Sequence, residues 1–368
     1  MTNAYECTTQ PQRSQAADPL RTRDFRLLVA GLGISLFANL MLRFAMSMWV
    51  LDETGSAAAF ASILTASILP TILLSPLGGV MADRTNRRTV MVALDALSAV
   101  TVLVCAAIFS SAGFNLAAIA VMQVALAVLD AMETPTVQAA LPQMFRSHGE
   151  DVMRRAMAVV NVVTAVDDLR AAGRFLTREH PHVLHLVLIC AALNFLVTGY
   201  AEVGFPYMVR TVLGFGSTAY GLAYGLVGAS GLLGALVGGR VARSLSMRRF
   251  PMAIAAFSLT ILPQALAMTI PAGGVMRLAV LTASTCGTMI VITLANLIAV
   301  PAIQMGCPEN MTGKVMSLAL SASMCAQPLG QIAYGWAYSV YPAGAVLAVT
   351  FVLATAMLPP AAHVTRRF

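Results

Sequence analysis

Charged residues are scarce in this chain of 368 residues. Only 11% are Asp, Glu, Lys or Arg, whereas a soluble domain carries about 25%, and 58% are hydrophobic. This balance excludes an ordinary soluble domain and predicts a polytopic membrane protein. The formal net charge of +7 does not indicate nucleic-acid binding, because the arginines occupy short segments between apolar runs. We therefore expect no nucleic acid among the partners.

Several functional signatures are also missing. None of the six cysteines forms a CxxC pair, which favours small packing residues over a metal or redox site. No Gly-rich loop ending in lysine is present to bind phosphate, so ATP is not expected to drive any process. We predict no enzyme activity, no cofactor and no metal. Residues 1–22 lack an apolar core segment, which favours a disordered cytoplasmic tail over a cleaved signal peptide.

Ten apolar runs are long enough to cross a bilayer, which takes about 20 residues as a helix. Lipid offers no hydrogen-bond partner to an open backbone, so each run is expected to be helical. The predicted fold class is an all-α polytopic membrane protein. The runs are 27–51, 57–82, 90–110, 114–133, 184–209, 218–239, 251–271, 278–300, 315–340 and 343–362.

Two basic strips, 78–88 and 238–249, follow the second and sixth runs. By the positive-inside rule each marks a cytoplasmic loop. With ten spans and a cytoplasmic start, 20 of the 23 lysines and arginines fall on that same side. The sequence therefore predicts two cytoplasmic termini in a multi-pass protein of the cell membrane. The repeated strip also suggests two related halves.

The first strip resembles the signature loop of the major facilitator superfamily. A glycine is followed four residues later by Asp-Arg and then by two basic residues, although Asn86 stands where a glycine is common. The flanking segments 51–57, 313–317 and 326–330 look like the drug-exporter branch that contains macrolide-efflux-like and enterobactin-exporter-like proteins. The residues of the strip that carry the resemblance are Gly79, Asp83, Arg84, Arg87 and Arg88.

The resemblance implies a secondary transporter whose two helical bundles surround a central cavity. It also indicates that helices are missing, because such proteins have twelve spans and only ten are predicted in this chain. Residues 156–166 are apolar but would reach only about 17 Å as a helix, against roughly 30 Å of hydrocarbon. Most of the fifth helix and the sixth therefore look absent. The predicted organisation is a tail (1–24), a four-span bundle (25–155), a cytoplasmic amphipathic linker (156–183) and a six-span bundle (184–368).

By the resemblance, spans one, four, five and eight line the cavity. Polar side chains in a membrane usually face such a cavity or a partner. Arg43 and Glu202 reach similar depths, so they could form an ion pair that acts as an outer gate, a static pair, or two groups that reach the interface separately. The candidates are Asn39, Arg43, Asp130, Glu133, Asn194, Glu202 and Asn296.

Asp130 and Glu133 lie one turn apart and share a face of span four. Two close carboxylates suit reversible proton binding, although they could also be interfacial groups beside loop arginines. Span four holds no arginine, so the charged arginine motif of many proton antiporters is absent.

The signature loop is expected to act as a conformational latch. By the resemblance, Asp83 meets the positive N-terminus of span nine near residues 313–315 and so stabilises the outward-facing state. Asp95 is expected to pair with Arg84 or Arg88. The alternative is a simple basic topology loop.

The expected function is export of a small, moderately apolar molecule by a monomer, driven by a proton or other ion gradient. The alternative is a shortened relative that no longer transports, or that assembles with another chain.

Overall fold

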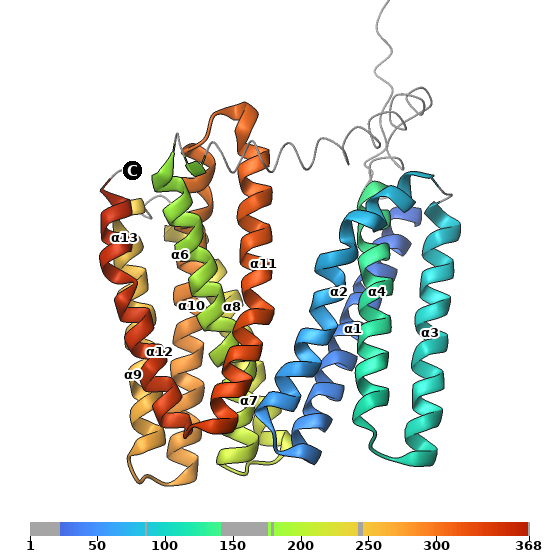
Figure 1. Ribbon diagram of the computed structural model, residues 1–368, viewed down its shortest axis with the longest axis horizontal. Helices are drawn as coiled ribbons and strands as arrows, with labels where there is room; N and C mark the ends of the chain where they lie inside the picture. The colour runs from blue at the N-terminus through green and yellow to red at the C-terminus, as the bar shows by residue number, and fades with distance from the viewer. Residues whose placement is uncertain (1–22, 85–86, 141–175, 178–179, 242–245, 367–368) are drawn as a thin grey trace, which may run out of the picture.

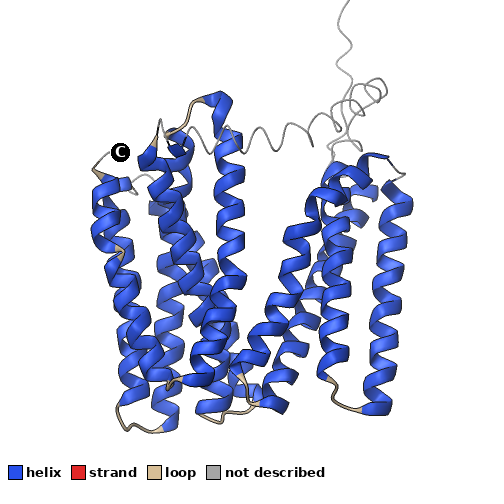
Figure 2. Ribbon diagram, in the orientation of Figure 1, coloured by secondary structure: helices blue, strands red, loops and turns tan. Residues whose placement is uncertain are grey.

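The computed structural model describes residues 23–84, 87–140, 176–177, 180–241 and 246–366. These parts of the chain are helical, and they contain no strand (Figure 2). Four long helices come first, and the predicted linker helix at 156–166 lies outside the described residues. The four are α1 (Arg23–Thr54), α2 (Ala57–Arg84), α3 (Arg87–Ala112) and α4 (Leu116–Ala140).

The second group of helices begins after the undescribed segment. Its first member is one continuous rod, in which α6 (Pro181–Val197) runs into η4 (Thr198–Gly204), α7 (Phe205–Tyr207) and η5 (Met208–Val212). The stretches η4 and η5 are π-helical, a wider winding that is rare and frequently found at functional sites. The others are α8 (Ser217–Val241), η7 (Met247–Arg249) with α9 (Phe250–Thr269), α10 (Gly274–Met305), α11 (Glu309–Val340), α12 (Ala343–Ala356) and α13 (Leu358–Thr365).

Every predicted span overlaps one of these helices or continuous rods, and the all-helical fold class is confirmed. Within the described residues, six helices are long and apolar enough to cross a membrane. Two further apolar helices are shorter, Ala57–Thr71 and Leu116–Met132. The six are Thr89–Ala112, Pro181–Val212, Ser217–Arg240, Met247–Thr269, Gly274–Met305 and Ala343–Thr365. The chain is a multi-pass membrane protein.

Tight turns join consecutive helices at one end of the molecule. Gly55 and Gly113 follow α1 and α3 with φ of +60° and +70°, a conformation that glycine adopts without steric cost. The amide of Gly55 donates to the carbonyl of Leu51 and so satisfies a free group at the end of α1. These glycines let each helix reverse direction within two or three residues.

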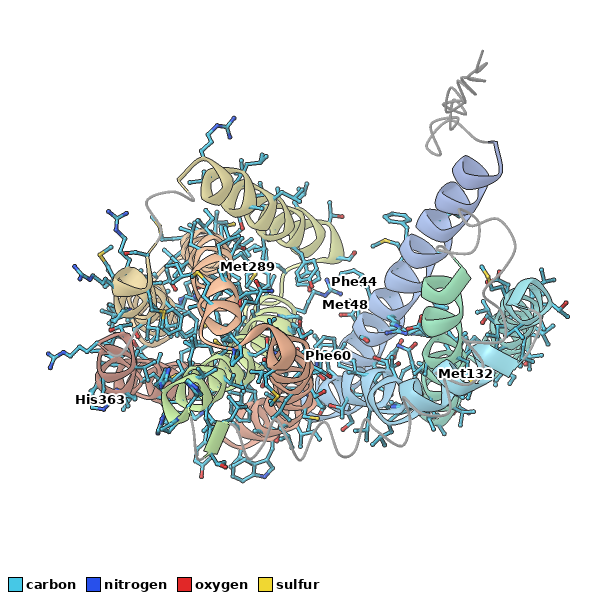
Figure 3. The ribbon with its side chains drawn as sticks, turned by 90° about the horizontal axis from the view of Figure 1, so that it is seen from above. Phe44, Met48, Phe60, Met132, Met289 and His363 are labelled. Carbon is cyan, nitrogen blue, oxygen red and sulfur yellow. The ribbon has the colours of Figure 1, made fainter. Side chains whose placement is uncertain are left out.

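The helices form two bundles, α1–α4 and α6–α13 (Figure 1). The bundles meet at the end that carries the turns at Gly55 and Gly113, here called the closed end, and diverge toward the other, the open end. Contacts between the bundles join α2 with α11 and η4, and α1 with η5. Seen from above, Phe44, Met48 and Phe60 lie where the bundles meet (Figure 3). Met48 and Phe60 belong to the main apolar core, which is built mostly from the second bundle.

The outer faces of the bundles are apolar. Leu97 and Leu103 of α3 are 52% and 68% exposed, and Leu232 of α8 is 71% exposed. A large exposed apolar surface is a liability in water, but lipid covers it at no cost. This surface agrees with the membrane location that the composition predicts.

Candidate functional site at the interface between the bundles

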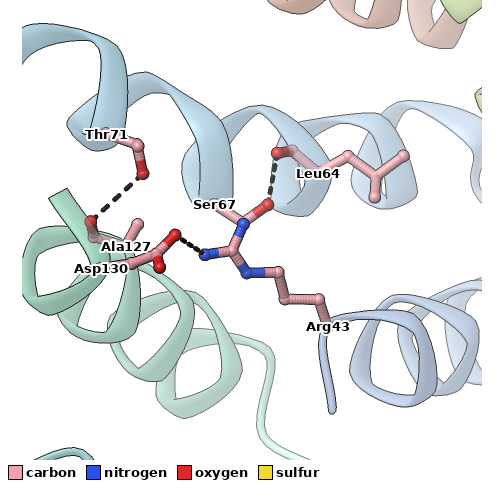
Figure 4. A network of polar contacts seen from close by, with 6 residues as sticks. All are labelled: Arg43, Leu64, Ser67, Thr71, Ala127 and Asp130. Carbon is pink, nitrogen blue, oxygen red and sulfur yellow. Dashed lines mark hydrogen bonds and ion pairs between the residues drawn. The ribbon is translucent and has the colours of Figure 1, made fainter. Parts of the chain in front are cut away.

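An ion pair lies inside the first bundle, between α1 and α4. A guanidinium nitrogen of Arg43, Nη2, donates to Asp130 Oδ2 at 2.9 Å, and the two side chains are 24% and 23% exposed (Figure 4). Around it, Ser47 Oγ donates to the carbonyl of Arg43, and Ser67 Oγ donates to that of Leu64. Both hydroxyls donate to carbonyls of their own helices and not to the ion pair. The carboxylate of Asp130 is therefore the group that balances the charge of Arg43.

The pairing of Arg43 with Glu202 that the sequence suggested is therefore wrong. Counting about 1.5 Å per residue, both side chains do lie roughly 15–17 Å from the closed end. Arg43, however, points to α4 within its own bundle, whereas Glu202 points to α11. Depth along a helix follows from the sequence, but direction around its axis depends on packing.

Glu202 belongs to a line of hydrogen bonds that crosses between the bundles. Its Oε2 accepts a hydrogen bond from Gln331 Nε2 at 2.9 Å, and Gln331 Oε1 accepts one from Thr65 Oγ1 at 3.3 Å. Thr65 is on α2, Gln331 on α11 and Glu202 on η4. Gln331 is fully buried, so both ends of its amide are satisfied within the protein. Sequence analysis missed Thr65 and Gln331, because an uncharged polar residue in an apolar run is a weak signal.

A second polar connection links the bundles at the closed end. Arg210 Nε donates to Asp52 Oδ1 at 2.9 Å, Nη2 contacts Asp52 Oδ2, and Nη1 donates to the carbonyl of Phe215 at 2.8 Å. Two parallel contacts fix both partners in direction as well as distance. Asp52 is on α1 and Arg210 on η5. The sequence carried a signal, since Arg210 is one of three basic residues that the topology places off the cytoplasmic side.

Close packing accompanies these polar links. A Cβ added at Gly335 of α11 would lie 2.4 Å from Ala61 Cβ and 3.0 Å from the carbonyl oxygen of Ala57, both on α2. Nearby, Phe44 of α1 stacks on Tyr220 of α8 with ring centroids 5.8 Å apart. The closed end is therefore sealed by contacts that a larger side chain would disrupt.

Two of the predicted site residues border a cavity within the second bundle, not the predicted central cavity between the bundles. Asn194 of α6 and Asn296 of α10 border a space of about 340 Å³ in the second bundle, together with residues of α11. Asn194 Nδ2 donates to the carbonyl of Ser323 on α11 at 2.6 Å. The lining residues come from the halves of α6, α10 and α11 nearer the open end. Asn39, half-buried on α1, does not border this cavity.

Comparison with known proteins points to one fold. Residues 28–167, less than half of the chain, match the family model of the Major Facilitator Superfamily. A bacterial homologue of the iron transporter ferroportin in an inward-facing state is similar, with a TM-score of 0.60 and 14% identity over 93% of this chain and 98% of that one. The chain has a major-facilitator-like fold.

The outward-facing structure of a bacterial ferroportin homologue with soaked iron is also similar, with a TM-score of 0.49 and 16% identity over 90% of this chain and 97% of that one. No curated protein matches the chain. The family match and the inward-facing neighbour both support the expected major-facilitator-like fold. The drug-exporter branch that the sequence resembles stays a prediction.

In this major-facilitator-like fold the predicted latch residues lie at the open end. Gly79, Asp83 and Arg84 are in the last turns of α2, and Arg87 and Arg88 begin α3. Their side chains, and that of Glu133, lie outside the described part, whereas Asp95 is exposed on α3. The helix expected to receive Asp83 starts at Glu309, and α2 and α11 diverge toward this end (Figure 1). The latch stays a prediction for a conformation in which the open end closes.

Proposed function

We propose that this protein is a secondary transporter that exports a small, moderately apolar molecule by alternating access. One observation carries the proposal. The two interbundle polar links, Asp52–Arg210 and Thr65–Gln331–Glu202, belong to the closed half, while the bundles diverge in the other half. In alternating access, one gate is shut while two packed bundles leave the opposite side open.

The open end is proposed to face the cytoplasm. Arg240, Arg248 and Arg249 lie at the helix ends there, and basic residues near helix ends are retained on the cytoplasmic side. In this orientation both termini are cytoplasmic, and the conformation is inward-facing, like that of the similar bacterial ferroportin homologue. We place the protein in the cell membrane as a monomer.

Asp130 is the proposed site of ion coupling. A proton on its carboxylate would remove the charge that holds Arg43, and so would loosen α1 from α4. Glu133, one turn further along α4, is the second candidate. Iron is not the proposed substrate, because the described residues that line the cavity between α6, α10 and α11 offer amides, a hydroxyl and a thiol rather than carboxylates or imidazoles.

Transport in proteoliposomes tests the proposal. A panel of neutral and charged drugs, first ranked by susceptibility of a host lacking its own pumps, is loaded and an inward-acidic or outward-acidic gradient is imposed. We expect gradient-dependent movement of at least one neutral compound, abolished by a protonophore. The double variant Arg43→Gln/Asp130→Asn should lose the gradient dependence, whereas Glu53→Gln, a carboxylate bonded within α1, should not. No movement of any compound by correctly inserted protein would instead favour the shortened, non-transporting relative.

A further inference from the structure

The cavity between α6, α10 and α11 has the size and chemistry of a small-molecule site. Its volume of about 340 Å³ is at the lower end of the ~300–1,000 Å³ found for such sites. Most of its wall is aliphatic, including Val187, Leu193, Ile292 and Ile303. An apolar wall with a few polar groups is the usual composition of a pocket that binds by shape and orients by hydrogen bonds.

Among the described residues that line the cavity, Cys190 with its thiol is the only one with an ionisable side chain. An ion that left water for this space would lose its hydration without meeting an opposite charge. The cavity therefore discriminates against metal cations, ammonium ions and carboxylates. A neutral ligand does not incur this cost.

Two side-chain amides supply the polar recognition. Because Asn194 Nδ2 is bonded to the carbonyl of Ser323, the Asn194 side chain is held in one direction and its Oδ1 remains as an acceptor. Asn296, on the facing helix α10, is exposed and makes no hydrogen bond to any other described residue. It can therefore donate and accept. One fixed acceptor beside one free amide matches a ligand group that has both an N–H or O–H and a carbonyl.

We infer that this cavity binds a neutral, mostly apolar molecule carrying an amide-type hydrogen-bonding group. The group donates to Asn194 Oδ1 and accepts from Asn296 Nδ2, while its apolar part fills the aliphatic wall. The inference rests on the proposed transport function, because it names the substrate class and the place where the substrate is held.

Binding is measured on the full-length protein in lipid nanodiscs, separately from transport. Benzanilide is the neutral amide probe, trans-stilbene is its isostere without hydrogen-bonding groups, and benzyltrimethylammonium is the cation. The readouts are protection of Cys190 from a maleimide, in a variant that keeps this cysteine alone, and equilibrium dialysis of radiolabelled probe. We expect benzanilide to bind about a hundredfold tighter than stilbene, as two hydrogen bonds worth about tenfold each predict. The cation is expected not to protect.

The variant Asn296→Leu should weaken benzanilide binding about tenfold and leave stilbene binding unchanged. Thr293→Val is the matched control, because Thr293 is also on α10 but bonds to its own helix and does not line the cavity. Equal binding of benzanilide and stilbene, protection by the cation, or equal loss in both variants would overturn the inference. Selective binding without transport would contradict only the proposed function. Transport that Asn296→Leu leaves unchanged, with no binding, would contradict only this inference.

Discussion

Neutralising Asp52 should loosen the closed end without unfolding the protein. Asp52→Asn keeps the shape of the side chain but removes the charge that Arg210 contacts through two nitrogens. Arg210 keeps its hydrogen bond to the carbonyl of Phe215, so it is not left without a partner. The link between α1 and η5 is weakened, and each bundle stays intact.

The expected size follows from the exposure of the pair. The Arg210 side chain is 15% exposed and that of Asp52 is 38% exposed, so water still screens the carboxylate. Exposed pairs contribute 0–1 kcal/mol, and the two-contact geometry places this one near the top of that range, at about 1 kcal/mol. A loss of that size multiplies the ratio of separated to joined closed ends about fivefold.

Spin-label distances report that ratio. Ala117, at the start of α4, and Ala272, before α10, are exposed at the closed end of the two bundles. With a label on each, pulsed electron resonance should show a longer-distance population that grows about fivefold relative to the short one in Asp52→Asn.

Glu53→Gln is the matched control, because Glu53 is adjacent and accepts from Trp49 on the same helix. The charge exchange Asp52→Arg/Arg210→Asp should restore much of the original distribution. An unchanged distribution in Asp52→Asn, or the same change in Glu53→Gln, would refute the assignment of this pair as the seal.

Three further predictions concern packing and buried polar groups. Gly335→Val should separate the closed end in the same spin-label assay, since even a Cβ clashes with α2, whereas Gly231→Val on α8, where nothing lies within 4 Å, should not. Arg43→Leu should lower the thermal midpoint in detergent, because it leaves the Asp130 carboxylate unpaired at a cost on the order of 3 kcal/mol in the free energy of unfolding. Adding Asp130→Leu should recover most of this loss, and no recovery would contradict the pairing. Glu202→Leu should lower the free energy of unfolding by about 1–3 kcal/mol, because the buried amide of Gln331 loses its acceptor. Glu202→Gln should lower it less, and equal losses in the two variants would argue against this hydrogen bond.

The sequence predicted the placement of the described helices well, because length and apolarity are properties of single segments. It also nominated Asn194 and Asn296, which do line one cavity. Partners across helices were harder to predict. Arg43 and Glu202 share a depth but face different neighbours, and no periodicity in a nearly uniform apolar run tells which face of the helix meets which.

The partner of Arg210 at the closed end was also beyond sequence reasoning. Asp52 and Arg210 are 158 positions apart, on α1 and η5, and they meet because the bundles pack there. Gly199 and Gly204 gave no interpretable signal either. Each leaves room for a tyrosine ring of α11, since a Cβ would come within 2.2 Å of Tyr334 or 2.4 Å of Tyr338.

The wide winding of η4 has a mechanical consequence. A π turn holds more residues than the 3.6 of an α turn, so η4 stores surplus chain within the rod. Rewinding by one residue would rotate everything beyond it by about 100°, and Arg210, two turns further on, would swing off the face that meets α1. A rotation that starts in η4, beside Glu202, would thus break the contact between Arg210 and Asp52. A label at Thr211 that reports no reorientation between conformations would exclude this rotation.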